Sequence, residues 1–598
     1  MNQIKQRSEI APEDTWAIED LYPSDEAWEA EFARIEEDKA LLASFDGKLN
    51  EANSLYTYLQ TMEAAEVRIE QLANYCMRKA DEDTRVGKYQ AMSGKFMSAV
   101  VALSAACSFE TPQIMAISNE ELDGFYKVCP DLERYRRHLT DMRRHKDHTL
   151  SPAEEKLLAS AGEMSQAPDS IYSLFADADL KFQDAADSEG KTHPLSQGTF
   201  ISYMESADRT LRKSAYENLY AGFSNFKNTA AGLLDAQNKQ LKFFATARKY
   251  PSAFEAALSR TNVPTQVYLN LIDTVHKNAD KMHRYIRLRK KLLGVDDLHF
   301  YDIYTPLVKD VDKHIPFAEA KQTVYDSLAP LGETYRAILK EGFEKRWIDV
   351  YQNEGKRSGA YSAGAAVHPY VLLNYTGTLD SQFTLAHEMG HALHSYLSNK
   401  HQNPIDADYV IFVAEVASTC NEALLMEYLL DKTTDKKERA YLINHFLDQF
   451  RGTIYRQTMF AEFELNIGRM VAEGRTLTAE VLCAEYRRLN ELYYGPDVEV
   501  DDQIAMEWAR IPHFYYNHYV FQYATGYAAA IALSRRILNE GECAVQDYLT
   551  FLSSGKTKSP IDLLKGAGVD MTTPAPVDSA LQLFGELLDE METLMEEA

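Results

Sequence analysis

Apolar and charged residues alternate along most of the chain at the spacing of amphipathic helices. The pattern is clearest in residues 27–42, 55–78 and 264–293, where apolar residues return every three or four positions. Ser151 is followed by Pro152 and two glutamates, which is the composition of a helix N-terminus. The chain is therefore predicted to be mostly α-helical.

Two segments interrupt this helical pattern. Residues 180–199 combine polar residues, glycines and a proline with short apolar pairs, which predicts a hairpin and a lobe boundary. Residues 355–380 are rich in Gly, Ala, Ser and Tyr, and they predict a flexible loop that leads into a strand at residues 367–373. We therefore expect an N-terminal helical lobe, residues 1–190, and a larger C-terminal domain, residues 191–598.

Length and charge narrow the classes of function. The chain has 598 residues, and a single hydrophobic core stops growing at about 250–300, so two or more lobes or an enlarged helical fold are expected. Its 63 basic and 90 acidic residues give a formal charge of −27, which repels phosphate backbones and anionic lipid headgroups. Nucleic acid and membrane partners are therefore not expected.

The cysteines and the first residues of the chain bear on its compartment. Six cysteines are scattered without close pairs, which indicates neither a disulfide framework nor a cysteine-based metal site. The first ten residues contain no continuous apolar segment that could act as a signal peptide, and no later stretch approaches 18 uninterrupted apolar residues. We expect a cytoplasmic protein.

The chemistry of the chain is concentrated in an H-E-x-x-H motif, which spans His387, Glu388 and His391 in a helix-compatible stretch. Two histidines four residues apart lie about 40° apart around a helix, so both imidazoles can reach one ion at about 2.0–2.1 Å. Glu388 is offset toward the water that such an ion would bind, which suits a general base. This pattern is typical of a hydrolytic zinc site.

A catalytic zinc needs a third protein ligand, and Glu415 is the candidate because it is surrounded by small and apolar residues. Glu422 follows seven residues later, within about 20° of the same helical face, and is expected to accept an N–H from a ligating histidine. His394 competes as a ligand. We prefer Glu415, since His394 lies about 10 Å along the helix axis from His387.

The motif at residues 387–394, followed by Phe412-Val413-Ala414-Glu415-Val416-Ala417-Ser418, resembles the thimet oligopeptidase-like family of zinc metallopeptidases. The loop at residues 355–362 and the segment at residues 511–516 are similar as well. The resemblance implies a two-lobed, almost all-helical zincin-type fold that encloses a deep substrate channel, with a small β-sheet beside the active-site helix. It also implies that the domain of residues 191–598 is catalytic and cleaves short, unstructured peptides.

Within this family, histidine and aromatic side chains that follow the metal ligands stabilise the tetrahedral intermediate. By position these are His513, Tyr519 and Tyr523 here, with His518 and Tyr527 as neighbouring alternatives. If a helix begins near Pro512, steps of about 100° place the three residues within an arc of roughly 120°. A tyrosine stripe of this spacing is also typical of core packing.

Peptide binding is expected at the glycine-rich loop of residues 355–362. With Gly355 and Gly359 as hinges, the loop should close over a peptide and align it against the strand at residues 367–373. The candidate substrate-binding residues share this region or follow the tyrosine stripe; they are Gly359, Tyr361, His368, Tyr370 and Tyr527.

These observations predict a zinc-dependent endopeptidase that hydrolyses short oligopeptides by attack of a metal-activated water, with one catalytic zinc ion. Whether it forms a homo-oligomer stays open. A zinc hydrolase of another acyl bond, such as a deformylase, is one alternative, although a small formyl group needs no enclosure of this size. A helical binding or scaffold protein whose metal is structural or absent is the other.

Overall fold

The computed structural model describes residues 4–308 and 314–596, and it is mostly helical, as predicted. Two compact units divide the chain. Unit 1 consists of Met1–Thr149, Lys313–Leu425 and Leu533–Gly568, and unit 2 consists of Leu150–Asp312, Met426–Ala532 and Val569–Ala598. Each unit is assembled from three separate chain segments, so these divisions do not coincide with the single boundary near residue 190 that the sequence predicts.

Most of unit 1 is helical. Its α-helices are α1 (Asp25–Phe32), α2 (Arg34–Ala43), α3 (Ala52–Glu82), α4 (Gly87–Ala106), α5 (Glu110–Ala116), α6 (Asn119–Val128), α7 (Arg136–Arg143), α17 (Phe317–Ser327), α18 (Gly332–Glu344), α19 (Leu379–His401), α20 (Pro404–Ala407), α27 (Glu542–Leu552) and α28 (Pro560–Gly566). Two further helices, α21 (Ile411–Lys432) and α26 (Phe521–Glu540), each run from one unit into the other.

Helices also dominate unit 2. They are α8 (Pro152–Ser160), α9 (Gly162–Ser165), α10 (Ala167–Ser173), α11 (Gln197–Met204), α12 (Arg209–Ser224), α13 (Lys227–Ala247), α14 (Ala253–Arg260), α15 (Thr265–Lys277), α16 (Ala279–Leu293), α22 (Lys436–Phe450), α23 (Arg456–Ala472), α24 (Ala479–Tyr494), α25 (Asp502–Ala505) and α29 (Ala575–Glu596). The predicted helix at residues 264–293 is two helices, α15 and α16, separated at Asn278.

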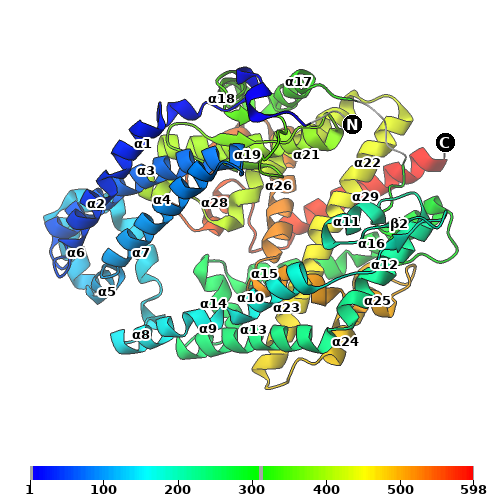
Figure 1. The fold of residues 1–598 in the computed structure, drawn as a ribbon, viewed down its shortest axis with the longest axis horizontal. Helices are drawn as coiled ribbons and strands as arrows, with labels where there is room; N and C mark the ends of the chain where they lie inside the picture. Colours follow the sequence, from blue (N-terminus) through cyan, green and yellow to red (C-terminus); the bar gives the residue numbers. More distant parts are fainter. Residues whose placement is uncertain (1–3, 309–313, 597–598) are drawn as a thin grey trace. The chain divides into compact units, whose positions relative to one another are not determined.

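The longest helix, α3, organises the core of unit 1. Figure 1 shows α3 and α4 running side by side, with α2 against the pair. Trp28 of α1 is fully buried, stacks on Phe32 and donates its indole N–H to the carbonyl oxygen of Leu72 at 2.9 Å. This aromatic packing and the hydrogen bond hold the short helix α1 against α3.

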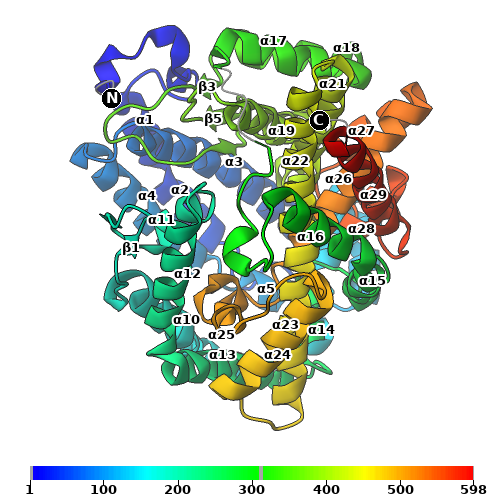
Figure 2. The same cartoon turned by 90° about the vertical axis from the view of Figure 1, so that its right-hand side faces the viewer.

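A three-stranded sheet lies beside α19 in unit 1 (Figure 2). Its strands are β3 (Ile348–Asp349), β4 (Tyr361–Ala363) and β5 (Tyr370–Leu372), in the order β3-β5-β4. The central strand β5 pairs parallel with β3 and antiparallel with β4. The expectation that the strand of residues 367–373 pairs with a peptide is therefore wrong, because both edges of β5 are already occupied.

The predicted hairpin at residues 180–199 is present in unit 2. Its strands β1 (Ala185–Ala186) and β2 (Thr192–His193) pair antiparallel, and Gly190 takes a positive φ of 81° at the turn between them. The backbone N–H of Ala186 donates to the Ser214 hydroxyl of α12. The hairpin therefore packs on α12 within unit 2 rather than marking the border between the units.

One segment of the described chain, Gly87–Ala116, is long and apolar enough, judged by length and composition, to span a membrane. It is divided between α4 and α5, and α4 packs on α2 and α3 through Met92, Phe96 and Leu103. Only 22 % of its most apolar window is buried, so part of its apolar surface is exposed. The absence of a membrane partner stays a prediction.

Candidate metal centre

The H-E-x-x-H motif lies in the middle of α19. The helix begins after Thr378, whose hydroxyl accepts the backbone N–H of Ser381 at 3.1 Å, and Asp380 occupies the first turn. Capping of this kind starts the helix well before the motif, so His387 and His391 are separated by one regular turn. Their imidazole rings lie 4.8 Å apart. The predicted common face is therefore present.

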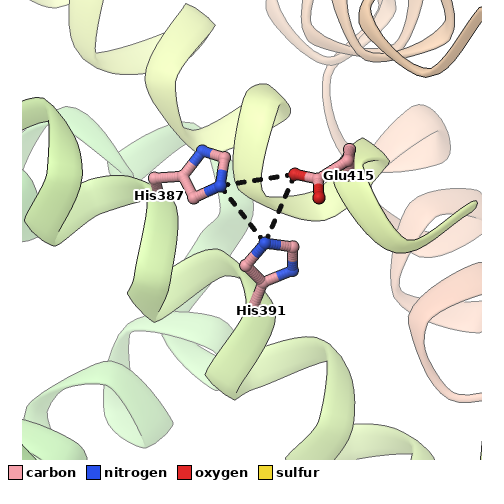
Figure 3. A group of neighbouring side chains, drawn as sticks. All are labelled: His387, His391 and Glu415. Atoms are coloured by element: carbon pink, nitrogen blue, oxygen red, sulfur yellow. Dashed lines mark hydrogen bonds and ion pairs between the residues drawn. The ribbon is translucent and has the colours of Figure 1, made fainter. Parts of the chain in front are cut away.

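The neighbouring helix α21 brings Glu415 to these two histidines. Figure 3 shows the three side chains pointing toward one another. The Nε2 atoms of His387 and His391 are 3.2 Å apart, and they lie 3.3 Å and 3.4 Å, respectively, from Oε2 of Glu415. Within the described residues, these are the three side chains that group as candidate metal ligands.

The three separations test which ion the residues fit. A tetrahedral ion with bonds of 2.0–2.1 Å holds its ligand atoms about 3.3–3.4 Å apart, whereas an octahedral ion with similar bonds holds adjacent ligands about 2.9 Å apart. The observed values of 3.2–3.4 Å agree with the tetrahedral case. Two imidazole nitrogens and one carboxylate oxygen are also a donor set that suits zinc.

Carboxylates hold the histidines in place. Glu422, two turns after Glu415 on α21, lies 2.7 Å from Nδ1 of His387. Burial alone would lower the pKa of His387, but hydrogen bonds and charges from Glu415 and Glu422 raise it well above its ordinary value. Burial would likewise raise the pKa of Glu415, and the two imidazoles lower it instead. The carboxylates of Glu415 and Glu422 therefore favour a positive charge at or beside the two imidazoles.

Glu388 occupies a different environment on the same helix. Its side chain is 7 % exposed, and Oε2 has no hydrogen-bond partner among the described residues. Burial raises its pKa, which the neighbouring histidines partly offset. A buried carboxylate with a free oxygen can take up a proton, as general-base chemistry requires.

The alternative ligand His394 is turned away from this group. It is 1 % exposed, and its ring stacks on Tyr409 at a centroid distance of 3.8 Å with an interplanar angle of 5°. Burial lowers the pKa of His394 to about 3, so the ring is neutral. His394 therefore packs against the segment that precedes α21.

The loop at residues 355–362 is fixed at its start. The carbonyl oxygen of Gly355 accepts the backbone N–H of Thr84 at 2.7 Å, and a Cβ atom at this glycine would collide with the Asp83 carboxylate. The buried ammonium of Lys356 lies 2.7 Å from Oδ1 of Asp349. Gly355 is therefore a fixed point and not a hinge, in contrast to the prediction. Gly359 has a φ of 83°, and its carbonyl oxygen accepts the side-chain N–H of Asn374 at 2.8 Å, so this part of the loop is also tied down.

Several predicted substrate contacts have packing roles instead. His368 is 7 % exposed and stacks on Trp347 with a centroid distance of 5.5 Å. Tyr370 is fully buried and donates its hydroxyl to the carbonyl oxygen of Ala17 at 3.2 Å. Neither side chain is available to a ligand. Tyr361 of β4 is half-buried and donates to the Asp81 carboxylate at 2.5 Å.

A cavity of about 440 Å³ lies within unit 1, between α3, α19, α20 and the end of β4. Its walls include Glu66 and Glu70 of α3, Ser362 of β4, Ser395 of α19 and Tyr409. Ser395 follows His391 by one helical turn, so the cavity begins close to the metal ligands. Among the described residues, no strand pairs with the outer edge of β4.

The structure groups His513, Tyr519 and Tyr523 in unit 2. The His513 ring lies 6.4 Å from that of Tyr519 and 6.0 Å from that of Tyr523, and the two tyrosine rings are 5.4 Å apart. Burial lowers the pKa of His513. The segment is not the continuous helix that the spacing argument assumes, because Pro512–Tyr515 is a 3-10 turn and α26 begins only at Phe521.

The two alternatives to these residues have other partners in unit 2. His518 is buried, and its Nδ1 lies 3.2 Å from the hydroxyl of Tyr268. Tyr527 is 4 % exposed and packs against Phe450. A predicted substrate contact for Tyr527 is therefore not supported by its position.

Four residues that no sequence pattern singles out meet at the junction of α19 and α21; they are Gly390, Ser418, Asn421 and Tyr335. Gly390 contacts the backbone of Ser418, and Asn421 bridges α19 and Tyr335. Gly390 and Ser418 belong to the two zinc-site motifs, but a single sequence carries no signal of which backbone a glycine approaches. Their role becomes visible only when the two helices are placed together.

Comparison with known proteins identifies the family. The sequence profile described as "Peptidase family M3" matches residues 202–583, and the profile "Oligopeptidase F" matches residues 113–182. Oligopeptidase PepF of Bacillus subtilis is 46 % identical over 596 residues, which is 99 % of this chain and 89 % of the relative. An oligoendopeptidase F homolog of Lactococcus lactis is 40 % identical over 99 % of both chains.

Solved structures agree with this assignment. A chain from Chlamydophila abortus has a TM-score of 0.93 and 38 % identity, over 99 % of this chain and 100 % of its own length. Oligoendopeptidase-F from Enterococcus faecium has a TM-score of 0.75 and 36 % identity, over 96 % and 100 % of the two chains. With these matches along nearly its whole length, the chain belongs to peptidase family M3, in the oligoendopeptidase F group of metalloendopeptidases.

Proposed function

We propose that this peptidase binds one zinc ion through His387, His391 and Glu415 and uses it to cleave short, unstructured oligopeptides. The observation that carries the proposal is the set of separations of 3.2–3.4 Å between the three ligand atoms, which suits tetrahedral zinc. Three protein ligands leave the fourth position free, as catalytic zinc sites require and structural ones do not.

Glu388 is the general base in this proposal. Zinc, when bound, supplies Lewis-acid polarisation of the water and of the substrate carbonyl. Glu388 follows a ligand directly, so its carboxylate is close to the reacting atoms without serving as a ligand. It takes a proton from the attacking water and delivers it to the departing amine nitrogen.

Glu422 orients His387. Its Oε1 lies 2.7 Å from Nδ1, so it holds the proton on that nitrogen and leaves the lone pair of Nε2 directed at the ion site. A carboxylate behind a ligating imidazole also makes the imidazole a stronger donor. We therefore assign Glu422 to tuning the affinity for the ion.

We place the peptide along the outer edge of β4. An extended chain can pair with a free strand edge through its backbone, and alternate side chains then enter adjoining space such as the cavity beside Ser362 and Ser395. Asn399→Trp would fill this cavity two turns past His391 and should raise KM without changing metal content. Lys400→Trp, at an exposed neighbour outside the cavity walls, is the control. An unchanged KM in Asn399→Trp would exclude this path.

We assign His513, Tyr519 and Tyr523 to the oxyanion that forms when water attacks the peptide carbonyl. The assignment rests on the family resemblance, and the grouping of the three rings supports it. A tyrosine hydroxyl stays protonated near neutral pH, since its ordinary pKa is about 10, so it can donate to developing negative charge. Burial lowers the pKa of His513, which favours a neutral ring that donates through one N–H.

We also propose that the enzyme works in the cytoplasm. All six cysteines are free, and three from the N-terminal part, Cys76, Cys107 and Cys129, are buried, as suits a reducing compartment. Cell fractionation with an activity assay tests this. Activity that sediments with membranes would contradict the proposal and would direct attention to Gly87–Ala116.

Purified protein decides the main proposal. Metal analysis should find about one zinc per chain, a chelator should abolish cleavage of a quenched-fluorescent peptide, and added zinc should restore it. Mass spectra of a digested peptide mixture should show internal cleavage of short peptides and leave folded proteins intact. A protein that cleaves these peptides equally well after complete removal of metal would overturn the proposal.

A further inference from the structure

Gly390 stands where α19 crosses α21, between the two histidine ligands. A Cβ atom at this position would lie 2.5 Å from Cα of Ser418 and 2.8 Å from the carbonyl oxygen of Ala417. Both are backbone atoms, so no side-chain rotation can relieve the contact. The absence of a side chain at Gly390 therefore sets how closely the two helices approach.

A buried amide fixes the register of the same helix pair. Asn421 of α21 is fully buried and donates its side-chain N–H to the carbonyl oxygen of Ala386 at 3.1 Å, one residue before His387. The Asn421 carbonyl oxygen accepts the hydroxyl of Tyr335, a fully buried residue of α18, at 3.0 Å. Tyr335 thus orients the Asn421 amide, and the amide holds α21 beside the first ligand.

Ser418 connects this junction to the carboxylate ligand. Its backbone is the surface on which Gly390 rests, and its hydroxyl donates to Oε2 of Glu415 at 3.2 Å and to the Glu415 carbonyl oxygen at 3.0 Å. Residues 415, 418, 421 and 422 share one face of α21, because they are spaced by three, three and one positions. Any displacement of Ser418 is therefore passed to Glu415.

We infer that Gly390 and Asn421 are positioning residues, which set the separation and the register of α19 and α21 so that Glu415 meets both imidazoles. The inference rests on the metal site proposed above. Ordinary van der Waals contact begins at 3.4 Å, so a methyl group at Gly390 requires the backbones to separate by about 0.9 Å. Metal–ligand distances tolerate only about ±0.2 Å. The displacement is several times larger than this tolerance.

The test measures metal binding by the full-length apo protein. Zinc affinity is read by competition with a chromogenic chelator, and the visible spectrum of the Co²⁺ form reports the geometry of the ligands. Gly390→Ala should lower zinc affinity by about 10–100-fold and change the Co²⁺ absorption. Gly94→Ala is the matched control, because it also lies inside a helix of unit 1 and an added Cβ atom meets nothing within 4 Å.

Two further variants keep the test decisive if Gly390→Ala does not fold. Asn421→Leu removes both hydrogen bonds at similar size and should lower zinc affinity by about tenfold. Tyr335→Phe removes only the hydroxyl that orients Asn421, and a loss of about threefold is expected. Circular dichroism and the melting temperature of each apo form show whether the variant is folded.

The outcomes separate this inference from the proposed function. Folded variants that melt earlier but keep wild-type zinc affinity and the wild-type Co²⁺ spectrum would show that these residues serve packing alone, which overturns the inference. Wild-type protein without a tight zinc site would instead overturn the proposed function. Since the readout is metal affinity, a loss of peptide cleavage in a variant for another reason does not affect the inference about Gly390 and Asn421.

Discussion

The candidate metal ligands and the aromatic cluster of His513, Tyr519 and Tyr523 stand on two different kinds of backbone. His387, His391 and Glu415 stand on the regular helices α19 and α21, where spacing in the sequence translates directly into direction in space. The aromatic cluster stands on a 3-10 turn, a left-handed pair of residues and the start of α26. Helical spacing therefore places the two histidines of the first site on one face from the residues alone, and it fails at the second site.

The left-handed pair explains that failure. Asn517 and His518 have φ angles of 56° and 57°, which lie in the left-handed region and interrupt the helical backbone between the 3-10 turn and α26. The angular arc expected for a continuous helix from Pro512 therefore does not apply, because the helical backbone is interrupted between His513 and Tyr519. The three rings still group across this break, since those of Tyr519 and Tyr523 lie 6.4 Å and 6.0 Å from that of His513. In irregular segments, residue type identifies the candidates, and only the fold shows how they meet.

The largest expected effect tests the proposed metal site on the regular helices α19 and α21. Glu388→Gln should retain zinc and lower turnover by about 10²–10⁴-fold, because it removes the proton acceptor and keeps the size of the side chain. Zinc content and steady-state cleavage of a quenched-fluorescent peptide check this together. Turnover within about tenfold of wild type, with zinc bound, would eliminate Glu388 as the general base.

The next largest effect tests the aromatic cluster, whose backbone is irregular. Tyr523→Phe keeps the ring and removes the hydroxyl, so turnover should fall by about 10²–10³-fold while zinc content and the melting temperature stay near wild type. Tyr527→Phe, one turn further along α26 against Phe450, is the control and should stay near wild-type turnover. If turnover in Tyr523→Phe falls only in step with the melting temperature, the aromatic cluster serves packing, and only the metal site has a catalytic role.

A smaller effect is expected at the carboxylate behind His387. Glu422→Ala removes the partner of Nδ1 but leaves all three ligands, so zinc affinity should fall by about 10–100-fold. At saturating zinc, most of the turnover should return. Chelator competition and turnover at two zinc concentrations measure both quantities, and an affinity equal to that of wild type would remove Glu422 from the site.

The smallest effect on turnover is expected at Glu464, which supports the irregular segment. Glu464 is buried in unit 2 and accepts the backbone N–H of His518 at 3.1 Å, and burial raises its pKa from 4.5 to about 8. Between about pH 4.5 and pH 8, Glu464 is therefore expected to be protonated in the folded protein and ionised in the unfolded chain. The stability that this group contributes is complete below about pH 4.5 and decreases as the pH rises toward 8.

Glu464→Gln imitates the protonated side chain and should weaken that pH dependence. In the wild type, Glu464 should lower the free energy of unfolding by roughly 1–3 kcal/mol between pH 5 and pH 8, and the variant should lack this decrease. Turnover should change by less than about twofold. Urea unfolding followed by fluorescence at several pH values gives the midpoints. Parallel pH profiles for the variant and wild type would show that Glu464 is ionised in the folded protein.

The sequence predicts features that depend on local periodicity and misses those that depend on distant contacts. The contact of Glu422 with a ligating histidine follows from its helical spacing to Glu415 and from the chemistry of such a histidine, whereas only the structure shows that the partner is His387. Glu415 follows from its apolar surroundings. The close approach at Gly390 and the central place of β5 in its sheet do not, because each depends on a partner segment that local pattern does not identify.

The interleaved segments of the two units have a consequence for how the protein is made. The two helices that carry the proposed metal ligands, α19 and α21, have left the ribosome well before Leu533–Gly568, the last segment of unit 1, is translated. At about 5–20 residues per second, the roughly 100 intervening residues take about 5–20 s. Phe551, which packs on His394 beside the site, arrives in that last segment. A nascent chain therefore carries all three proposed ligands for several seconds before the last segment of unit 1 is present. We expect unit 1 to complete its fold, and the peptidase to become active, only after Leu533–Gly568 has been translated.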